Sequence, residues 1–158
     1  MRVMLDLNVI VDIAEAREGF CDKSREAFEK ALAEGVELFF PIHGFTTLHY
    51  LLAHAKKGET SKGYIAWLCD HVMCAPADMS VIKAACASAV KDFEDAVVDE
   101  TAQFIGCDFI VTRNTRHFEP SHVKVVSPGE FIEILSQNDS KSKVSDKQPK
   151  GETDRKHA

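Results

Sequence analysis

Acidic residues occur at two places in the sequence where carboxylates could bind a cation. Asp6 follows the apolar run from Val3 to Leu5. Burying a carboxylate at such a place costs desolvation free energy unless other groups interact with it. Asp92, Asp95 and Asp99 follow at i, i+3 and i+7, a spacing that places all three on one face of a helix. Like charges on one face repel, and a divalent cation would relieve that repulsion. Oxygen ligands of this kind suit Mg²⁺ or Mn²⁺.

Most of these acids also have a structural explanation, and both explanations stay open at this point. Asp6 could cap the helix that follows it, as could Asn8. Asp92 and Asp95 fall in the first turn of a predicted helix, where the macrodipole favours negative charge. That explanation does not cover Asp99, which lies further along the same helix.

A third polar segment, Thr112 to Asn114, follows the apolar run from Phe109 to Val111. Asn114 could donate a carbonyl ligand or form an Asx turn. Ligands of open α/β sheets bind beyond the carboxyl ends of the strands. We therefore expect Asp6, the acidic helix face and Asn114 to meet at one edge of a sheet.

The elements that must position these residues follow from the apolar pattern, which predicts strands that alternate with helices. The strands are expected at 3–5, 36–41, 72–74, 109–112 and 123–126, and the helices at 9–16, 21–34, 43–57, 60–71, 78–90, 91–105 and 128–135. This alternation predicts an α/β fold with a central, mostly parallel sheet flanked by helices. Neither a Gly-x-Gly-x-x-Gly motif nor a Walker A motif occurs, so a dinucleotide-binding or P-loop protein is not indicated.

Composition narrows the class of protein further. The chain has 158 residues, of which 45% are hydrophobic and 28% charged, as in one globular domain. No apolar run approaches the roughly 18 residues of a membrane span. The net charge of -6 argues against a general polyanion-binding surface. Five cysteines without a Cys-x-x-Cys motif predict free thiols in a reducing cytoplasm.

The composition changes at Ser136. The segment 136–158 is polar, with six basic and four acidic residues, and cannot bury enough apolar surface to offset chain entropy. We therefore predict a folded domain over residues 1–135 and a disordered polar tail over 136–158.

Taken together, four segments of this chain resemble the PIN-domain family, in particular the VapC-like ribonuclease toxins of bacterial toxin–antitoxin pairs. The segments are 4–10, 92–96, 110–114 with Phe118, and 126–131, and their order and spacing cover residues 1–135. The resemblance implies a PIN-like three-layer fold and a Mg²⁺- or Mn²⁺-dependent endoribonuclease site. It also implies a homodimer and a cognate antitoxin protein as partner.

By position, Asp6 corresponds to the first acid of the family and Asp95 to the third. Asn114 stands where many relatives have the fourth acid. The second acid is usually a glutamate in a Thr-x-x-Glu setting, and His49 takes its place here. His117 stands where relatives often have an aspartate. The resemblance therefore predicts a metal site in which neutral residues replace two carboxylates.

The resemblance also suggests roles for neighbouring residues. Asp92 and Asp99, one turn on either side of Asp95, could compensate for the missing carboxylates as metal ligands. His49 could be a metal ligand, a phosphate contact or a packed side chain. Asn8 and Thr112 would support the ligands by hydrogen bonds. Basic residues near the site could contact RNA or be ordinary surface charges: Arg113, Arg116, Lys56, Lys57 and Lys62.

Three other functions remain possible on the sequence. Asp6 to Val9 is similar to the Asp-x-Asp-x-Thr/Val motif of haloacid-dehalogenase phosphatases, but Asn8 replaces the second aspartate and no Gly-Asp-x-x-x-Asp follows. The neutral residues at His49, Asn114 and His117 suggest a PIN-fold RNA- or protein-binding module without catalysis. The third possible function is that of a nuclease that acts in RNA processing rather than as a toxin.

Overall fold

The chain folds around a five-stranded sheet in which every pair of neighbouring strands is parallel. The computed structural model describes residues 1–145, without the side chains of 56–59 and 139–145. The strand order is β3-β2-β1-β4-β5. The strands are β1 (Arg2–Leu5), β2 (Glu37–Pro41), β3 (Met73–Ala75), β4 (Phe109–Val111) and β5 (Lys124–Val126).

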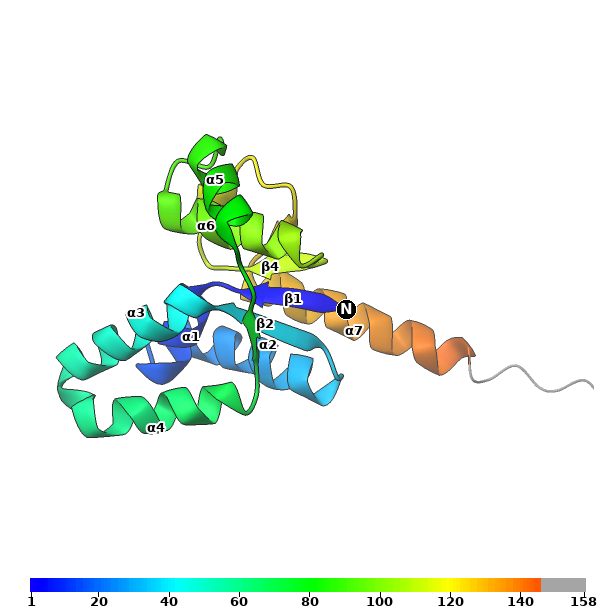
Figure 1. Cartoon of the computed structure of the whole chain (residues 1–158). Coiled ribbons are helices and arrows are strands. Elements are labelled where there is room, and N and C mark those ends of the chain that lie inside the picture. Colours follow the sequence, from blue (N-terminus) through cyan, green and yellow to red (C-terminus); the bar gives the residue numbers. More distant parts are fainter. Residues whose placement is uncertain (146–158) are drawn as a thin grey trace, which may run out of the picture.

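Helices cover both faces of this sheet (Figure 1). One face is covered by α6, on which α5 packs in turn, and the other face packs against the remaining helices. The predicted α/β fold, with a parallel sheet between two helical layers, is therefore confirmed. The helices are α1 (Leu7–Ala14), α2 (Cys21–Ala33), α3 (Ile42–Leu52), α4 (Gly58–Cys69), α5 (Met79–Ala87), α6 (Phe93–Phe104) and α7 (Pro128–Ser145).

The central strands are apolar on both faces because both are covered. In β1, Val3 and Leu5 belong to the larger core cluster, together with residues of α1, α2, α3 and α7. Met4, between them, faces the other side and belongs with Phe39 and Ile110 to the cluster beneath α6. The alternation of side chains along a strand therefore divides β1 between two cores and leaves Asp6 to follow at the carboxyl edge.

Glycine ends the two helices whose ends the sequence predicted best. Gly35 follows α2 with φ 66°, and Gly106 follows α6 with φ 69°, the left-handed conformation that glycine adopts without a steric cost. Between α3 and α4, residues Ala53–Lys57 form a π-helical turn, so the predicted helix over 43–57 is not a regular α-helix to its end.

The predicted end of the last helix at Leu135 is wrong. Helix α7 continues to Ser145, because neither glycine nor proline interrupts the chain between Phe131 and Pro149. Residues 136–145 of the predicted tail are therefore helical, and 146–158 lie outside the described residues. None of the helices within residues 1–145 is both long and apolar enough to cross a bilayer.

Candidate functional site

Asp6 lies at the junction of β1 and α1 and is 6% exposed. Its Oδ2 accepts a hydrogen bond from Asn8 Nδ2 at 2.6 Å and another from Thr112 Oγ1 at 2.6 Å. The side chain makes no capping hydrogen bond to α1. The structure therefore does not support the alternative that Asp6 caps this helix. Asp6 is therefore a buried carboxylate oriented by two side chains.

The pKa of Asp6 is raised from 3.8 to about 6. Burial is the largest cause, and the hydrogen bond from Thr112 opposes it. The negative charges of Asp95 and Glu94 raise the pKa further, so the beginning of α6 faces the same edge of the sheet as Asp6. A carboxylate with such neighbours is electrostatically suited to a cation.

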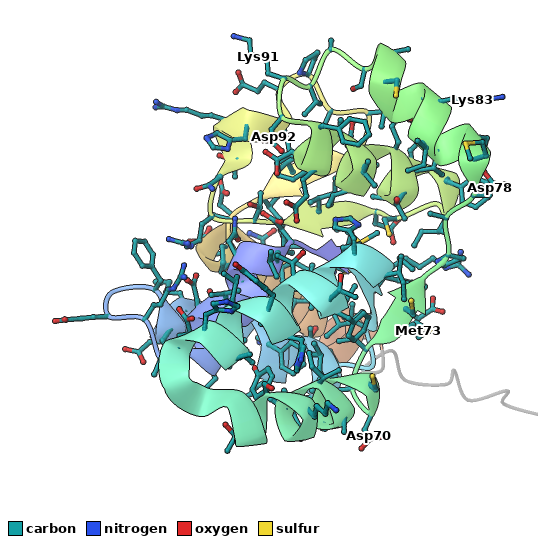
Figure 2. The ribbon with its side chains drawn as sticks, turned by 60° about the vertical axis from the view of Figure 1, so that its left-hand side comes forward. Asp70, Met73, Asp78, Lys83, Lys91 and Asp92 are labelled. Atoms are coloured by element: carbon teal, nitrogen blue, oxygen red, sulfur yellow. The ribbon has the colours of Figure 1, made fainter. Side chains whose placement is uncertain are left out.

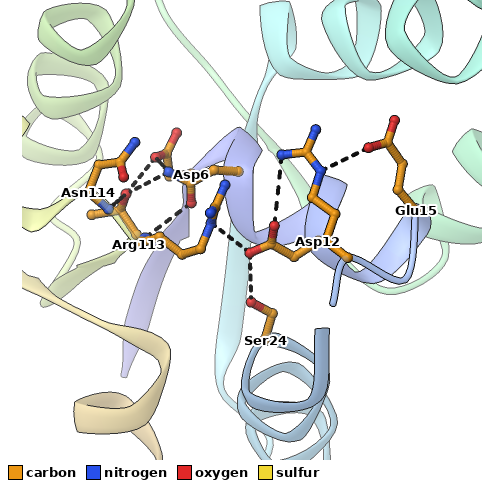
Figure 3. A network of polar contacts seen from close by, with 9 residues as sticks. Asp6, Asp12, Glu15, Ser24, Arg113 and Asn114 are labelled. Carbon is orange, nitrogen blue, oxygen red and sulfur yellow. Dashed lines mark hydrogen bonds and ion pairs between the residues drawn. The ribbon is translucent and has the colours of Figure 1, made fainter. Parts of the chain in front are cut away.

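The turn that follows β4 is built around the hydroxyl of Thr112, which is fully buried. This hydroxyl donates to Asp6 and accepts hydrogen bonds from the backbone N–H of Asn114 and from Asn8 Nδ2, both at 3.0 Å. It thereby uses its one donor and both of its acceptor positions. Asn8 Oδ1 accepts from the backbone N–H of Arg113 at 3.1 Å. Figure 3 shows these contacts linking α1 to the end of β4.

Asp92 and Asp95 have different tasks at the beginning of α6. Asp92 is the N-cap, and its Oδ1 accepts from the backbone N–H groups of Glu94 at 2.9 Å and Asp95 at 3.1 Å. Figure 2 shows Asp92 at this helix start, beside Lys91. The cap engages Oδ1 of Asp92, and the role of this residue as a metal ligand stays a prediction.

Asp95 lies in the first turn of α6 and is half-buried. Its pKa is raised by burial first and by the charge of Asp92 second. His117 opposes both effects, with Nδ1 at 3.5 Å from Asp95 Oδ2. His117 therefore forms an ion pair with Asp95 when its imidazole is protonated.

Asp99 lies in a different environment. It is fully buried, and its Oδ1 accepts a hydrogen bond from Ser121 Oγ, ahead of β5. Its Oδ2 has no hydrogen-bond partner among the described residues. Burial raises the pKa of Asp99, and Ser121 and His122 oppose that rise. The structure does not support the prediction that Asp99 binds a metal, because the next turn of α6 points its carboxylate toward the segment before β5.

Sequence reasoning missed the pair formed by His43 and Glu94. His43 Nε2 lies 3.7 Å from Glu94 Oε1 and joins the first turn of α3 to the first turn of α6. Burial lowers the pKa of His43, and Glu94 partly offsets this. The signal was present in the position of His43, directly after the carboxyl end of β2. His49 lies further along α3 and is half-buried, and its imidazole makes no hydrogen bond or ion pair with the described residues.

Sequence reasoning also missed Asp12, whose side chain is fully buried in α1. Its Oδ2 lies 2.8 Å from Arg113 Nε, and the Arg113 guanidinium lies 4.3 Å from the ring centroid of Phe20. The charge of Arg113 is therefore paired within the protein, and its predicted contact with RNA stays a prediction. A lone acid in the apolar stretch from Val9 to Ala14 was the available signal.

The surface beside Asp95 has mixed charge. A cavity of about 450 Å³ lies there, lined by Lys91, Asp92, Arg116, His117 and Glu119. Arg116 and His117 are exposed, and their contact with RNA stays a prediction. Of the predicted lysine group, Lys62 is exposed, whereas the side chains of Lys56 and Lys57 lie outside the described residues.

The donors at this edge fit a cation that needs few protein ligands. Within the described part of the chain, no three His, Cys, Asp or Glu side chains converge on one point as a ready-made metal centre. Mg²⁺ is commonly bound through one or two carboxylates and keeps several waters. Asp6 and Asp95 offer two carboxylates, and the charge of Asp95 contributes to the raised pKa of Asp6.

Comparison with known proteins identifies the family. A family model described as "PIN domain" matches residues 2–116. No curated protein sequence matches the chain significantly. Three solved structures contain a chain of the same fold: VapBC2 from Rickettsia felis bound to a promoter DNA fragment, VapBC-1 from nontypeable Haemophilus influenzae, and DNA-bound VapBC from Salmonella typhimurium.

The likeness to these three structures is one of fold. In the order given above, the TM-scores are 0.62, 0.62 and 0.61, and the sequence identities are 14%, 13% and 17%. The superpositions cover 80%, 81% and 81% of this chain and 98% of each matched chain. The family match extends from β1 to the turn that carries Thr112 and Asn114. The chain therefore belongs to the PIN-domain family.

Proposed function

We propose that this chain is a Mg²⁺- or Mn²⁺-dependent endoribonuclease, the VapC-like toxin of a toxin–antitoxin pair. One observation carries the proposal. Asp6 is buried at the carboxyl edge of the sheet with its pKa raised to about 6, and Asp95 and Glu94 add negative charge there. A protein gains nothing in stability from a buried, crowded carboxylate, whereas a hydrolase that binds a cation needs one.

Asp6 and Asp95 would hold the cation, and Asn114, which is exposed in the turn after β4, would add an amide oxygen. When bound, the cation supplies Lewis acidity to the attacking water and to the scissile phosphate. Asn8 and Thr112 both donate to Oδ2 of Asp6. These hydrogen bonds orient the carboxylate and leave Oδ1 for the cation. At pH 7, above its pKa, Asp6 is mostly ionised as this role requires.

The proposed reaction is an in-line displacement at phosphorus. A bond forms between the oxygen of water and phosphorus while the bond from phosphorus to O3′ breaks. One proton of the water is lost and one is gained by the leaving O3′. The products are a 5′-phosphate and a 3′-hydroxyl, and the exposed Arg116 would contact the strand.

The proposed partners are RNA, a cognate antitoxin protein and a second copy of this chain. The fold shared with chains of VapBC structures supports the antitoxin. The five free cysteines favour a reducing compartment, and we place the protein in the cytoplasm.

A cleavage assay tests the proposal. End-labelled RNA is incubated with the purified chain and Mn²⁺ or Mg²⁺, and separately with EDTA. We expect cleavage only with the metal, and a loss of about 100-fold or more in Asp6→Asn and Asp95→Asn. Asp70→Asn is the matched control, because Asp70 is an exposed carboxylate after α4 (Figure 2). Equal activity of Asp6→Asn and Asp70→Asn would contradict the proposal.

A second candidate function is a PIN-fold RNA- or protein-binding module that has lost catalysis. The neutral residues His49, Asn114 and His117 at expected acidic positions favour it, as does the lack of a three-ligand cluster among the described side chains. Calorimetric titration with Mn²⁺ separates the two. RNA binding without a saturable Mn²⁺ site would favour the binding module.

A further inference from the structure

A buried ion pair lies beside the candidate site, between α1 and the turn after β4. Asp12 is fully buried, and its Oδ2 lies 2.8 Å from Arg113 Nε. Ser24 Oγ of α2 donates to the same oxygen at 3.3 Å. On the other side, Arg17 Nη1 lies 4.0 Å from Asp12 Oδ1. Figure 3 shows Asp12 between Arg113 and Ser24.

Stability alone does not explain such a pair. Burying the carboxylate of Asp12 costs desolvation free energy, and apolar replacements of buried ion pairs are often neutral or stabilising. Here the cost is only partly offset, since burial is the largest influence on the pKa of Asp12 and raises it against the opposing charges of Arg113 and Arg17. What the pair does provide is a defined position for Arg113, whose guanidinium also packs on Phe20.

The position of Arg113 matters because its backbone belongs to the site. Its N–H donates to Asn8 Oδ1 at 3.1 Å, and Asn8 Nδ2 donates to Asp6 Oδ2 at 2.6 Å. The neighbouring Thr112 hydroxyl donates to the same oxygen of Asp6. A continuous series of polar contacts therefore leads from Asp12 through Arg113 and Asn8 to Asp6.

We propose that Asp12 and Arg113 are positioning residues: their buried ion pair holds the turn after β4 so that Asn8 and Thr112 orient the carboxylate of Asp6. The part of this inference that concerns cation binding rests on the proposed function. The part that concerns the turn does not, and the two parts have separate readouts.

The test compares variants on the two sides of Asp12. Arg113→Gln removes the contact that leads to the site. Arg17→Gln and Ser24→Ala remove other contacts of Asp12 and are the matched controls. The double variant Asp12→Asn with Arg113→Gln removes both charges, so it avoids an uncompensated buried charge and keeps the test valid if Arg113→Gln alone does not fold.

Two measurements are made on each folded variant. Hydrogen exchange by NMR follows the backbone amide at position 113 and the side-chain amide of Asn8. Calorimetry follows Mn²⁺ affinity. We expect exchange at these amides to be about tenfold faster and Mn²⁺ binding about tenfold weaker in Arg113→Gln and in the double variant. The two controls should lower the melting temperature and leave both readouts at wild-type values.

The outcomes separate the two parts of the inference. Unchanged exchange at both amides in the double variant would overturn the positioning role, and so would equal changes in Arg17→Gln. If the wild-type protein binds no Mn²⁺ while the exchange pattern is as expected, the positioning of the turn stands and the proposed metal-dependent function fails.

Discussion

Thr112 donates its hydroxyl proton to Oδ2 of Asp6 at 2.6 Å, although the two residues are 106 positions apart in the sequence. The contact exists because β1 and β4 are neighbouring parallel strands in which Leu5 pairs with Val111. The residue after each strand therefore arrives at the same edge.

Thr112→Val tests this contact, because valine has nearly the same shape and lacks the hydroxyl. The buried carboxylate of Asp6 loses a donor, and the backbone N–H of Asn114 loses its acceptor. We expect the free energy of unfolding at pH 7 to fall by about 1–3 kcal/mol and the pKa of Asp6 to rise above about 6. Chemical denaturation and NMR titration measure these, with Thr112→Ser as the control that keeps the hydroxyl. Equal behaviour of the two variants would show that the hydroxyl has no such role.

The stability of the metal-free protein should depend on pH through Asp6. Its pKa is about 6 in the folded protein and 3.8 in the unfolded reference, so the folded state holds the proton more tightly. The contribution of Asp6 to the free energy of unfolding is fully present below pH 3.8 and is lost as the pH rises through about 6. In EDTA, the melting temperature of the wild type should therefore fall relative to that of Asp6→Asn across this range. Parallel curves for the two proteins would contradict the shift.

Cation binding should show the opposite dependence on pH. Because the proton on Asp6 competes with the metal, Mn²⁺ affinity should increase as the pH rises through about 6 and level off above it. Glu94→Gln removes a charge that raises the pKa of Asp6, so the midpoint should move to lower pH. Calorimetric titrations at a series of pH values measure both effects. An affinity that does not change between pH 5 and 7.5 would exclude Asp6 as a ligand.

His49→Glu tests the position where the resemblance predicts the second acid. We expect Mn²⁺ affinity to increase, because a carboxylate attracts a hard divalent cation more than an imidazole does. His49 is half-buried on α3. His43→Glu is the comparison variant, because it adds a carboxylate to the same helix at the edge of the sheet. Unchanged affinity with a lower melting temperature would mean that His49 does not occupy the second acidic position. Tighter binding without RNA cleavage would favour the binding module.

Asp99→Asn should leave Mn²⁺ binding unchanged. The side chain is fully buried with one oxygen unpaired among the described groups, and burial raises its pKa. Replacing a buried charge by a neutral amide of the same shape should preserve or increase the free energy of unfolding at pH 7, by about 1 kcal/mol. Denaturation and Mn²⁺ calorimetry check both statements. A loss of Mn²⁺ affinity would return Asp99 to the set of metal ligands.

The sequence by itself determined the class of fold and the edge at which polar residues gather. Apolar runs, alternating with helical spacing, are local signals, and Gly35 and Gly106 end α2 and α6 where the pattern predicts. The convergence of Asp6 with the turn at Thr112 follows from topology alone, because parallel strands end at a common edge. These conclusions need no knowledge of side-chain contacts.

Only the tertiary structure decided which acids reach that edge. The spacing of Asp92, Asp95 and Asp99 predicted one shared face, yet one caps the helix and another hydrogen-bonds to Ser121. Helical spacing predicts which residues share a face of a helix. It does not predict which part of the protein each turn of that face contacts. Asp12 and Arg113 were beyond prediction for a related reason: the pairing of two charges far apart in the chain is set by the packing of α1 against the end of β4.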